Sequence, residues 1–121
     1  MLKNPYPGKF IVFEGLDGSG STTQASKLRD WLNKIPREFV LGKPIANLTK
    51  EPTNNIIGGL IRGQLTGDWK TRPECLQLLF AADRSHHLEK EVIPLLKNGV
   101  TVISDRYFLS TIAYGAAEIV D

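Results

Sequence analysis

Residues 15 to 22 decide the fold, and they read Gly15-Leu16-Asp17-Gly18-Ser19-Gly20-Ser21-Thr22. They follow a short apolar run, Phe10 to Glu14, which predicts a buried strand. From Thr22 onward apolar residues recur at helical spacing until Pro36, which should end the helix. A glycine-rich turn between a strand and a helix lets backbone N–H groups converge on an anion, and the helix N-terminus adds a positive dipole. The turn is therefore predicted to bind phosphate.

The turn matches the phosphate-binding motif GxxxxGK[ST] at every fixed position except one. Ser21 stands where the motif has lysine, so it can donate a hydrogen bond but supplies no charge. Thr22 keeps the hydroxyl that would coordinate magnesium. Either another cation replaces the lysine, or the site binds a nucleotide without efficient turnover. The predicted nucleotide-binding residues are Gly15, Leu16, Asp17, Gly18, Ser19, Gly20, Ser21, Thr22 and Thr23.

Strands and helices continue to alternate along the chain. The expected segments are a strand around Ile45 to Thr49, a short helix over Ile57 to Leu65, a helix from near Arg72 to Gly99, a strand from Val100 to Ser104, and a helix from Leu109 to Ala116. Thr71 and Glu74 match a capping box, and the long helix should bend or restart before Pro94. Strands separated by helices imply an α/β fold with a parallel sheet and crossover connections.

Length and composition restrict the protein class. The chain has 121 residues, which predicts a single domain over residues 1–121. Its longest apolar runs fall far short of the roughly 20 residues that span a bilayer, so no membrane partner is expected. The first residues lack a signal-peptide segment and Cys75 has no cysteine partner, which favours the cytoplasm. The net charge of +2 comes without a long basic run, so no nucleic-acid partner is expected.

Asp105 and Arg106 directly follow the last predicted strand. Asp105 should emerge at the carboxyl edge of the sheet, next to the phosphate turn if the two strands are neighbours. There it could hold magnesium or a metal-bound water, and Arg106 could bind phosphate with its planar guanidinium. An isolated Asp-Arg pair would more often be an ion pair or a helix cap. The phosphate turn reverses that preference.

Three blocks of sequence resemble thymidylate kinase. They are Phe10 to Gly20, Leu79 to Arg84, and Val102 to Tyr107 followed by Ser110, Ala113 and Tyr114. The blocks occur in the order and spacing of that family and cover nearly the whole chain. The resemblance implies a P-loop NTPase-type three-layer sandwich with a parallel sheet. It also implies that the family's C-terminal strands and its arginine-bearing lid are absent from these residues.

The implied activity is transfer of the γ-phosphoryl group of ATP to dTMP, giving dTDP and ADP. The implied cofactors are ATP and Mg²⁺, and the implied assembly is a homodimer. By the same resemblance Asp17, Asp105 and Arg106 are catalytic, with Asp17 near the deoxyribose 3′ position and Arg106 bridging the donor and acceptor phosphates. Thr22 and Asp105 would hold the metal. Arg62 resembles the arginine that binds the acceptor monophosphate, although it could equally be an exposed helix charge.

The resemblance also assigns the nucleoside contacts. Phe80 is similar to the aromatic residue that stacks on thymine, although an aromatic at helical spacing is more often part of the core. Arg84 resembles the residue that hydrogen-bonds a thymine carbonyl. Thr111 lies where relatives carry a polar residue that contacts the base, and Tyr114 where they carry an aromatic that packs against the sugar and disfavours a 2′-hydroxyl. A kinase for another deoxynucleoside monophosphate stays open as an alternative.

No chemistry is assigned to five other residues, which are His86, His87, Trp31, Trp69 and Cys75. His86 and His87 are expected to face solvent, because adjacent histidines do not share one helix face. Trp31 is expected to pack on the sheet, and Cys75 to be a small buried residue rather than a nucleophile.

Overall fold

A three-stranded parallel sheet lies at the centre of the computed structural model, which describes residues 3–15, 19–35 and 45–106. The strands are β1 (Phe10–Phe13), β2 (Ala46–Lys50) and β3 (Thr101–Asp105), in the order β1-β3-β2. β3 pairs with both neighbours, and its last residue, Asp105, is in register with Phe13 and with Lys50. The three strands therefore end at one edge of the sheet. The predicted strands and their parallel direction are confirmed, with bounds shifted by about one residue.

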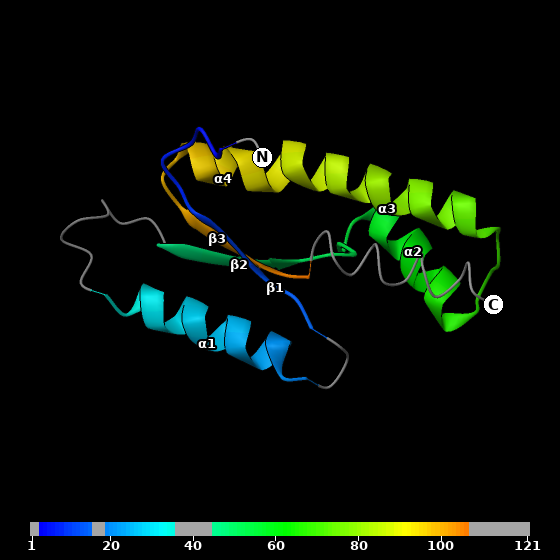
Figure 1. The fold of residues 1–121 in the computed structure, drawn as a ribbon, viewed down its shortest axis with the longest axis horizontal. Helices are drawn as coiled ribbons and strands as arrows, with labels where there is room; N and C mark the ends of the chain where they lie inside the picture. The colour runs from blue at the N-terminus through cyan, green and yellow to red at the C-terminus, as the bar shows by residue number, and fades with distance from the viewer. Residues whose placement is uncertain (1–2, 16–18, 36–44, 107–121) are drawn as a thin grey trace.

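The helices follow the predicted order as far as the described residues extend. They are α1 (Ser21–Asn33), α2 (Ile56–Thr66), α3 (Pro73–His87), the π-helical segment η2 (Leu88–Val92) and α4 (Ile93–Lys97). The last three form one long column (Figure 1). The column changes its helix type just before Pro94, which cannot donate a backbone hydrogen bond, and stops before Gly99, whose φ is +78°. The expected restart and stop are confirmed. No described helix is long and apolar enough to cross a membrane.

The helices cover both faces of the sheet (Figure 1). On one face α1 packs through Ala25 against Ala46 and Ile103. On the other, Val92 and Leu96 of the long column pack against Val102. Side chains alternate between the two faces along each strand, so neighbouring residues of β3 enter different layers. The described part of the chain therefore has the expected three-layer architecture.

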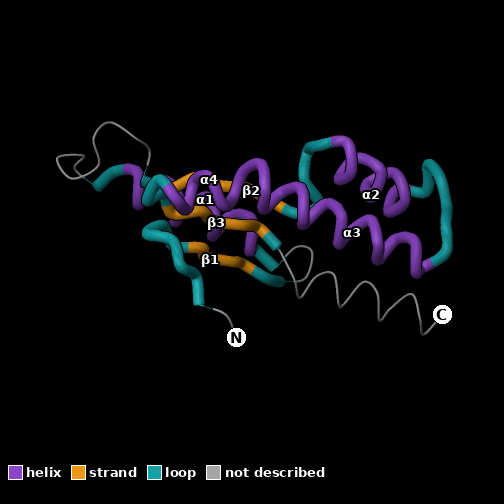
Figure 2. Tube along the Cα trace, turned by 90° about the horizontal axis from the view of Figure 1, so that it is seen from above, coloured by secondary structure: helices purple, strands orange, loops and turns teal. Residues whose placement is uncertain are grey.

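A second apolar cluster lies outside the sheet layers. α2 and α3 pack on each other through Ile61, Leu76 and Phe80, with Leu79 at the margin. Seen from above, this helix pair extends past the end of the sheet (Figure 2). The loop between β2 and α2 thus lies between the sheet and the helix pair.

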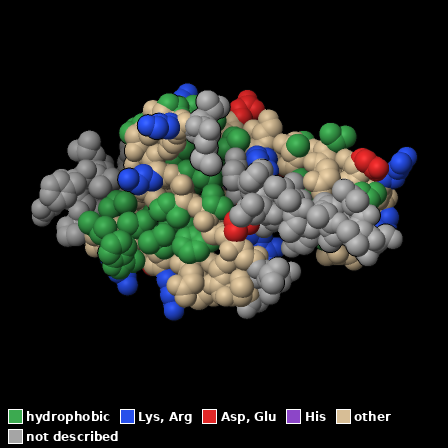
Figure 3. Space-filling model, in the orientation of Figure 1, with side chains coloured by type: hydrophobic (Ala, Val, Ile, Leu, Met, Phe, Trp, Pro, Cys, Tyr) green, Lys and Arg blue, Asp and Glu red, His purple; other side chains and the backbone are tan. Residues whose placement is uncertain are grey.

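Two expectations about burial are wrong. All four residues of β1 are half-buried rather than buried, because β1 is at the edge of the described sheet. Trp31 is 63% exposed, because Ala25, Leu28 and Leu32 form the sheet-facing stripe of α1 and Trp31 lies off it. Hydrophobic side chains accordingly gather on the visible surface over α1 and the adjoining strands (Figure 3).

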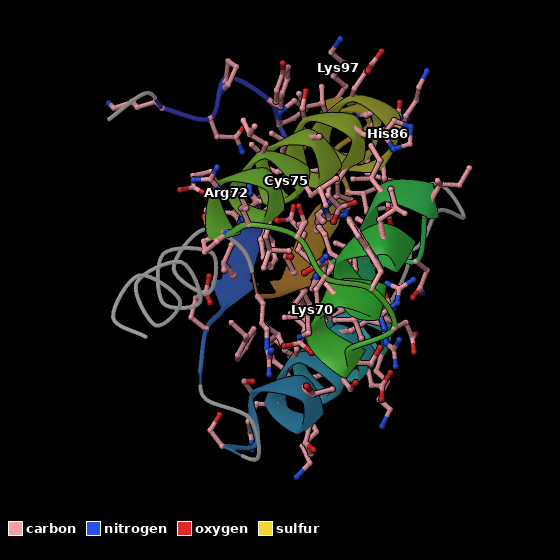
Figure 4. The ribbon with its side chains drawn as sticks, turned by 90° about the vertical axis from the view of Figure 1, so that its right-hand side faces the viewer. Lys70, Arg72, Cys75, His86 and Lys97 are labelled. Atoms are coloured by element: carbon pink, nitrogen blue, oxygen red, sulfur yellow. The ribbon has the colours of Figure 1, made fainter. Side chains whose placement is uncertain are left out.

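The start of α3 also differs from the expectation. Arg72 is the N-cap residue of α3 and makes no side-chain cap hydrogen bond. The prediction of a capping box formed by Thr71 and Glu74 is therefore wrong. Pro73 occupies the first helical position, as predicted, and thereby leaves Thr71 outside the helix. Cys75 is half-buried in the first turn, close to Arg72 (Figure 4).

We predict that two adjacent glycines of α2 respond oppositely to alanine. A methyl group at Gly58 would overlap the backbone of Thr53, whereas one at Gly59 would meet only Arg62 Nη2, at 3.7 Å. Gly58→Ala should therefore lower the free energy of unfolding by about 2 kcal/mol, because the backbone of Thr53 cannot move away from the added methyl group without strain. Gly59→Ala should raise it by up to about 1 kcal/mol through helix propensity. Urea denaturation of the intact natural protein measures both, and equal stabilities would contradict the close packing.

Candidate nucleotide-binding site

A hydrogen bond joins the first turn of α1 to the end of β3. Thr22 Oγ1 donates to Asp105 Oδ2 at 2.6 Å, across 83 positions of sequence. The contact forms because β1, which leads into the glycine-rich turn, pairs directly with β3. The structure thus confirms that Asp105 lies beside the glycine-rich turn. Its role there stays a prediction.

The second oxygen of Asp105 is available for a ligand. Asp105 Oδ1 is buried and has no hydrogen-bond partner in the described structure. A buried carboxylate oxygen normally has a hydrogen-bond partner, so the unpartnered Oδ1 of Asp105 is suited to binding a cation. Magnesium prefers such oxygen ligands and is usually held by one or two carboxylates together with substrate phosphates. Asp105, with the adjacent Thr22 hydroxyl, therefore suits Mg²⁺.

The described parts of the turn have the geometry that a glycine-rich loop requires. Gly20 is the N-cap of α1 and has φ +91°, a left-handed conformation that favours glycine. A Cβ at Gly15 would lie 2.5 Å from Ser19 Oγ, so the two ends of the turn approach each other closely. Ser21, Thr22 and Thr23 form the first turn of α1. The remaining predicted members of the turn, Leu16, Asp17 and Gly18, lie outside the described residues.

Arg106 adopts a left-handed backbone conformation at the end of β3, with φ +71°. Such a conformation is strained for a residue other than glycine, and surrounding contacts must hold it. Its N–H donates to the Phe13 carbonyl at 2.8 Å, and its own carbonyl accepts from the buried Ser104 Oγ at 2.7 Å. These bonds fix the backbone of Arg106 next to the end of β1, where the glycine-rich turn begins.

A cavity of about 290 Å³ opens beside the Thr22–Asp105 pair. Its walls come from α1, β2, the loop after β2, η2 and the end of β3. The polar side chains in these walls are Thr22, Thr49, Lys50, Thr53, Asn54, Asn55, Glu91 and Asp105. The cavity therefore combines two carboxylates, hydroxyls, amides and one lysine next to the carboxyl edge of the sheet.

Sequence reasoning missed a buried polar cluster centred on Glu51. Its Oε1 accepts from Arg84 Nε at 3.0 Å and lies 2.9 Å from Arg84 Nη2, and its Oε2 lies 2.8 Å from His87 Nδ1. His87 Nε2 lies 2.7 Å from Thr49 Oγ1. The side chains of Glu51 and His87 are 4% and 0% exposed, so both carboxylate oxygens are satisfied inside the protein.

A second set of bonds ties the loop after β2 to the helices. Thr53 donates to Asp83 with its backbone N–H at 2.8 Å and with its hydroxyl at 2.6 Å. Arg62 of α2 donates to the Thr53 carbonyl. The predicted acceptor-site residues Arg62 and Arg84 are therefore both anchored to this one loop.

The expectation that His87 faces solvent is wrong, because His87 is fully buried, whereas His86 is half-buried. Leu76, Phe80, Asp83 and His87 recur at helical spacing and share the buried face of α3. That spacing, together with the carboxylate that follows β2, was the available signal for the cluster.

The nucleoside-contact residues are only partly described. Phe80 is 4% exposed and packs in the cluster of α2 and α3, as an aromatic core residue would. Arg84 is bound to Glu51. Thr111 and Tyr114 lie outside the described residues, as does the helix expected from Leu109 to Ala116.

The fold and the site together define an α/β protein of the P-loop NTPase type. Solved structures with this fold include the thymidylate kinase from Ehrlichia chaffeensis, with a TM-score of 0.76 and 36% identity over 89% of this chain and 59% of that one. The thymidylate kinase from Candida albicans has a TM-score of 0.73 and 36% identity over 88% and 43%. A family model described as thymidylate kinase matches residues 13–121. The chain belongs to the thymidylate kinase family.

Curated relatives agree with this assignment. A probable thymidylate kinase from Pyrococcus horikoshii is 44% identical over 94% of this chain and 55% of its own length. A thymidylate kinase from Prochlorococcus marinus is 42% identical over 88% of this chain and 51% of its own. The chain thus spans about half the length of the curated relatives it matches.

We predict that Glu51→Gln lowers the free energy of unfolding by about 3 kcal/mol, because it leaves the buried His87 and the half-buried Arg84 without a carboxylate. Glu74→Gln is the matched control, since the Glu74–Arg72 pair is 3.5 Å apart with side chains 71% and 86% exposed. The control should change stability by no more than about 0.5 kcal/mol. Urea denaturation of the intact protein measures both, and similar effects would contradict a structural role for Glu51.

Proposed function

We propose that this chain carries the nucleotide site of an enzyme that transfers the γ-phosphoryl group of ATP to dTMP, giving dTDP and ADP. The observation that carries the proposal is the pairing of Thr22 with Asp105 beside the glycine-rich turn, with Asp105 Oδ1 unpartnered. Membership of the thymidylate kinase family supports dTMP as the acceptor. A homodimer, implied by the resemblance, and a cytoplasmic location, favoured by the amino-acid sequence, complete the proposal.

The donor side of the site would be formed by the glycine-rich turn and the first turn of α1. Backbone N–H groups from Gly15 to Thr23 would bind the polyphosphate of ATP, assisted by the positive end of the α1 dipole. Thr22 and Asp105 would hold Mg²⁺. When bound, the metal would neutralise charge on the β and γ phosphates during an in-line transfer. Asp17 would lie near the reaction centre and the deoxyribose.

Two arginines would bind the acceptor phosphate. Arg106 follows the metal-binding carboxylate directly, so its guanidinium would bridge the donor and acceptor phosphates. Arg62 bonds a neutral carbonyl, that of Thr53. No carboxylate of the described residues forms an ion pair with Arg62. Its charge is therefore uncompensated there, which suits an anionic phosphate.

Arg84 has a different electrostatic environment. Its charge is compensated by the buried carboxylate of Glu51 at 2.9 Å. A guanidinium in such a pair still donates hydrogen bonds but attracts anions less, so it suits a neutral carbonyl of a pyrimidine base. Phe80 would stack on the base, Thr111 would contact it, and Tyr114 would pack against the sugar.

Ser21 supports one alternative, a module of this fold that binds nucleotide with little or no turnover. The missing lysine removes a charge from the β and γ phosphates, where neutralisation is much of the catalysis. A kinase for another deoxynucleoside monophosphate is the second alternative, since acceptor choice depends on the surroundings of Arg84.

We predict that the intact natural protein, given ATP and Mg²⁺, phosphorylates dTMP in preference to dUMP, dCMP and dGMP. Arg84→Met should raise the KM for dTMP at least about tenfold, since it removes a charge-assisted hydrogen bond. A coupled assay for ADP with each acceptor measures both. A folded protein that binds ATP without forming dTDP would support the binding module, and a preference for another acceptor would support the other kinase.

We predict that Asp105→Asn lowers kcat at least about 100-fold, because the site loses its metal-binding carboxylate. The melting temperature should change little, since Asp105 Oδ1 has no protein partner to lose. Asp30→Asn, in an exposed ion pair with Arg29 on α1, is the matched control and should keep full activity. Activity measured against Mg²⁺ concentration tests the assignment. An Asp105→Asn enzyme with unchanged metal dependence would contradict it.

A further inference from the structure

The glycine-rich turn ends with a serine where a positive charge is expected, so another group must supply that charge if the site turns over. We propose that Lys50, at the end of β2, places its ammonium group at the phosphate site and takes over the charge that Ser21 lacks. The inference rests on the proposed function, because it assumes that the turn binds the polyphosphate of a nucleotide.

The sheet register places Lys50 next to the metal-binding carboxylate. Lys50 and Asp105 are paired residues of β2 and β3, and hydrogen-bonded strands lie about 4.8 Å apart. Ala46 and Leu48 pack against α1, and Lys50 continues their alternation on the same face of the sheet. Its side chain therefore leaves the strand on the α1 side.

Asp105 lies on that same face. Ile103, two residues before it, packs against Ala25 of α1, and Asp105 itself accepts the hydrogen bond from Thr22. Lys50, Asp105 and Thr22 consequently come from three different elements and line one cavity of about 290 Å³. Of the residues that line this cavity, Lys50 is the one with a positive charge.

The ammonium group of Lys50 has no carboxylate partner among the described residues. Lys50 is exposed, and its side chain forms no hydrogen bond or ion pair within residues 3–15, 19–35 and 45–106. The cavity contains one further carboxylate, that of Glu91, whose Oε2 lies 3.4 Å from His87 Nε2. Arg84, by contrast, forms an ion pair with Glu51. Lys50 is therefore available to an anion beside Asp105.

The chemistry of lysine fits this task. Its ammonium is a compact point charge on a flexible stem of four carbons, and in phosphate-binding loops lysine acts as a point charge. A lysine that reaches in from β2, on the far side of β3 from β1, could contact the phosphate oxygens that lie next to Asp105. A serine in the turn would then leave space for it. Lys50 would thus be a catalytic residue of the transfer.

The test compares five forms of the intact natural protein: Lys50→Met, Lys50→Arg, Ser21→Lys, the double variant Ser21→Lys with Lys50→Met, and the control Lys27→Met. Lys27 is exposed on α1 and loses the same charge at a position outside the cavity. The measurements are the dissociation constant of ATP with Mg²⁺ by calorimetry at low and high salt, kcat with dTMP, and the melting temperature.

Lys50→Met should weaken ATP binding and lower kcat, each at least about tenfold, as expected for loss of a charge-assisted contact. The binding loss should shrink at high salt, because salt screens an exposed charge. Lys50→Arg should retain most of the binding. The double variant should recover most of the loss, because the turn then carries its own lysine. The melting temperatures and the Lys27→Met control should be unchanged.

The result that would overturn the inference is an active parent protein in which Lys50→Met and Lys27→Met behave alike, or in which Ser21→Lys fails to rescue Lys50→Met. If the parent protein neither binds ATP nor forms dTDP, the proposed function itself fails. The two failures are therefore distinguishable.

Discussion

The pairing of β3 between β1 and β2 is the constraint on which the rest of the structure depends. Because the three strands are parallel and in register, Phe13, Asp105 and Lys50 end at one edge of the sheet. The three segments that leave this edge are the glycine-rich turn, the Arg106 backbone and the loop that begins at Glu51. Parallel strands require crossover connections, so helices cover both faces of the sheet (Figure 1), and the described residues form a cavity beside its carboxyl edge.

Buried polar bonds then fix the loop after β2 in one arrangement. Glu51 bonds two residues of α3, and Thr53 bonds Asp83 and Arg62. Since buried polar groups are costly when unsatisfied, this set of bonds disfavours alternative loop conformations. The same bonds also leave the positively charged side chains in different electrostatic environments. Arg84 is compensated by a carboxylate, whereas the positive charges of Arg62 and Lys50 are uncompensated within the described residues. Neutral and anionic parts of one substrate would thereby meet different surroundings.

Local patterns in the sequence were sufficient for the order and type of the described elements. The change from a short apolar run to helical spacing at Thr22 predicted β1 and α1, and Pro94 and Gly99 predicted the restart and end of the long column. The same patterns failed where two alternatives had similar local signals. The capping box at Thr71 was wrong because Pro73 sets the helix start, and Trp31 lies off the buried stripe of α1.

By itself the sequence determined a glycine-rich turn between a strand and a helix, an α/β chain and the missing charge at Ser21, because each is a property of neighbouring residues. Only the tertiary structure decided which distant residues meet. Thr22 bonds Asp105 across 83 positions, Glu51 bonds Arg84 and His87, and Lys50 lies beside Asp105. Such contacts depend on strand order and register. Periodicity within a segment carries no information about its neighbours in the sheet, so folding alone brings these groups together.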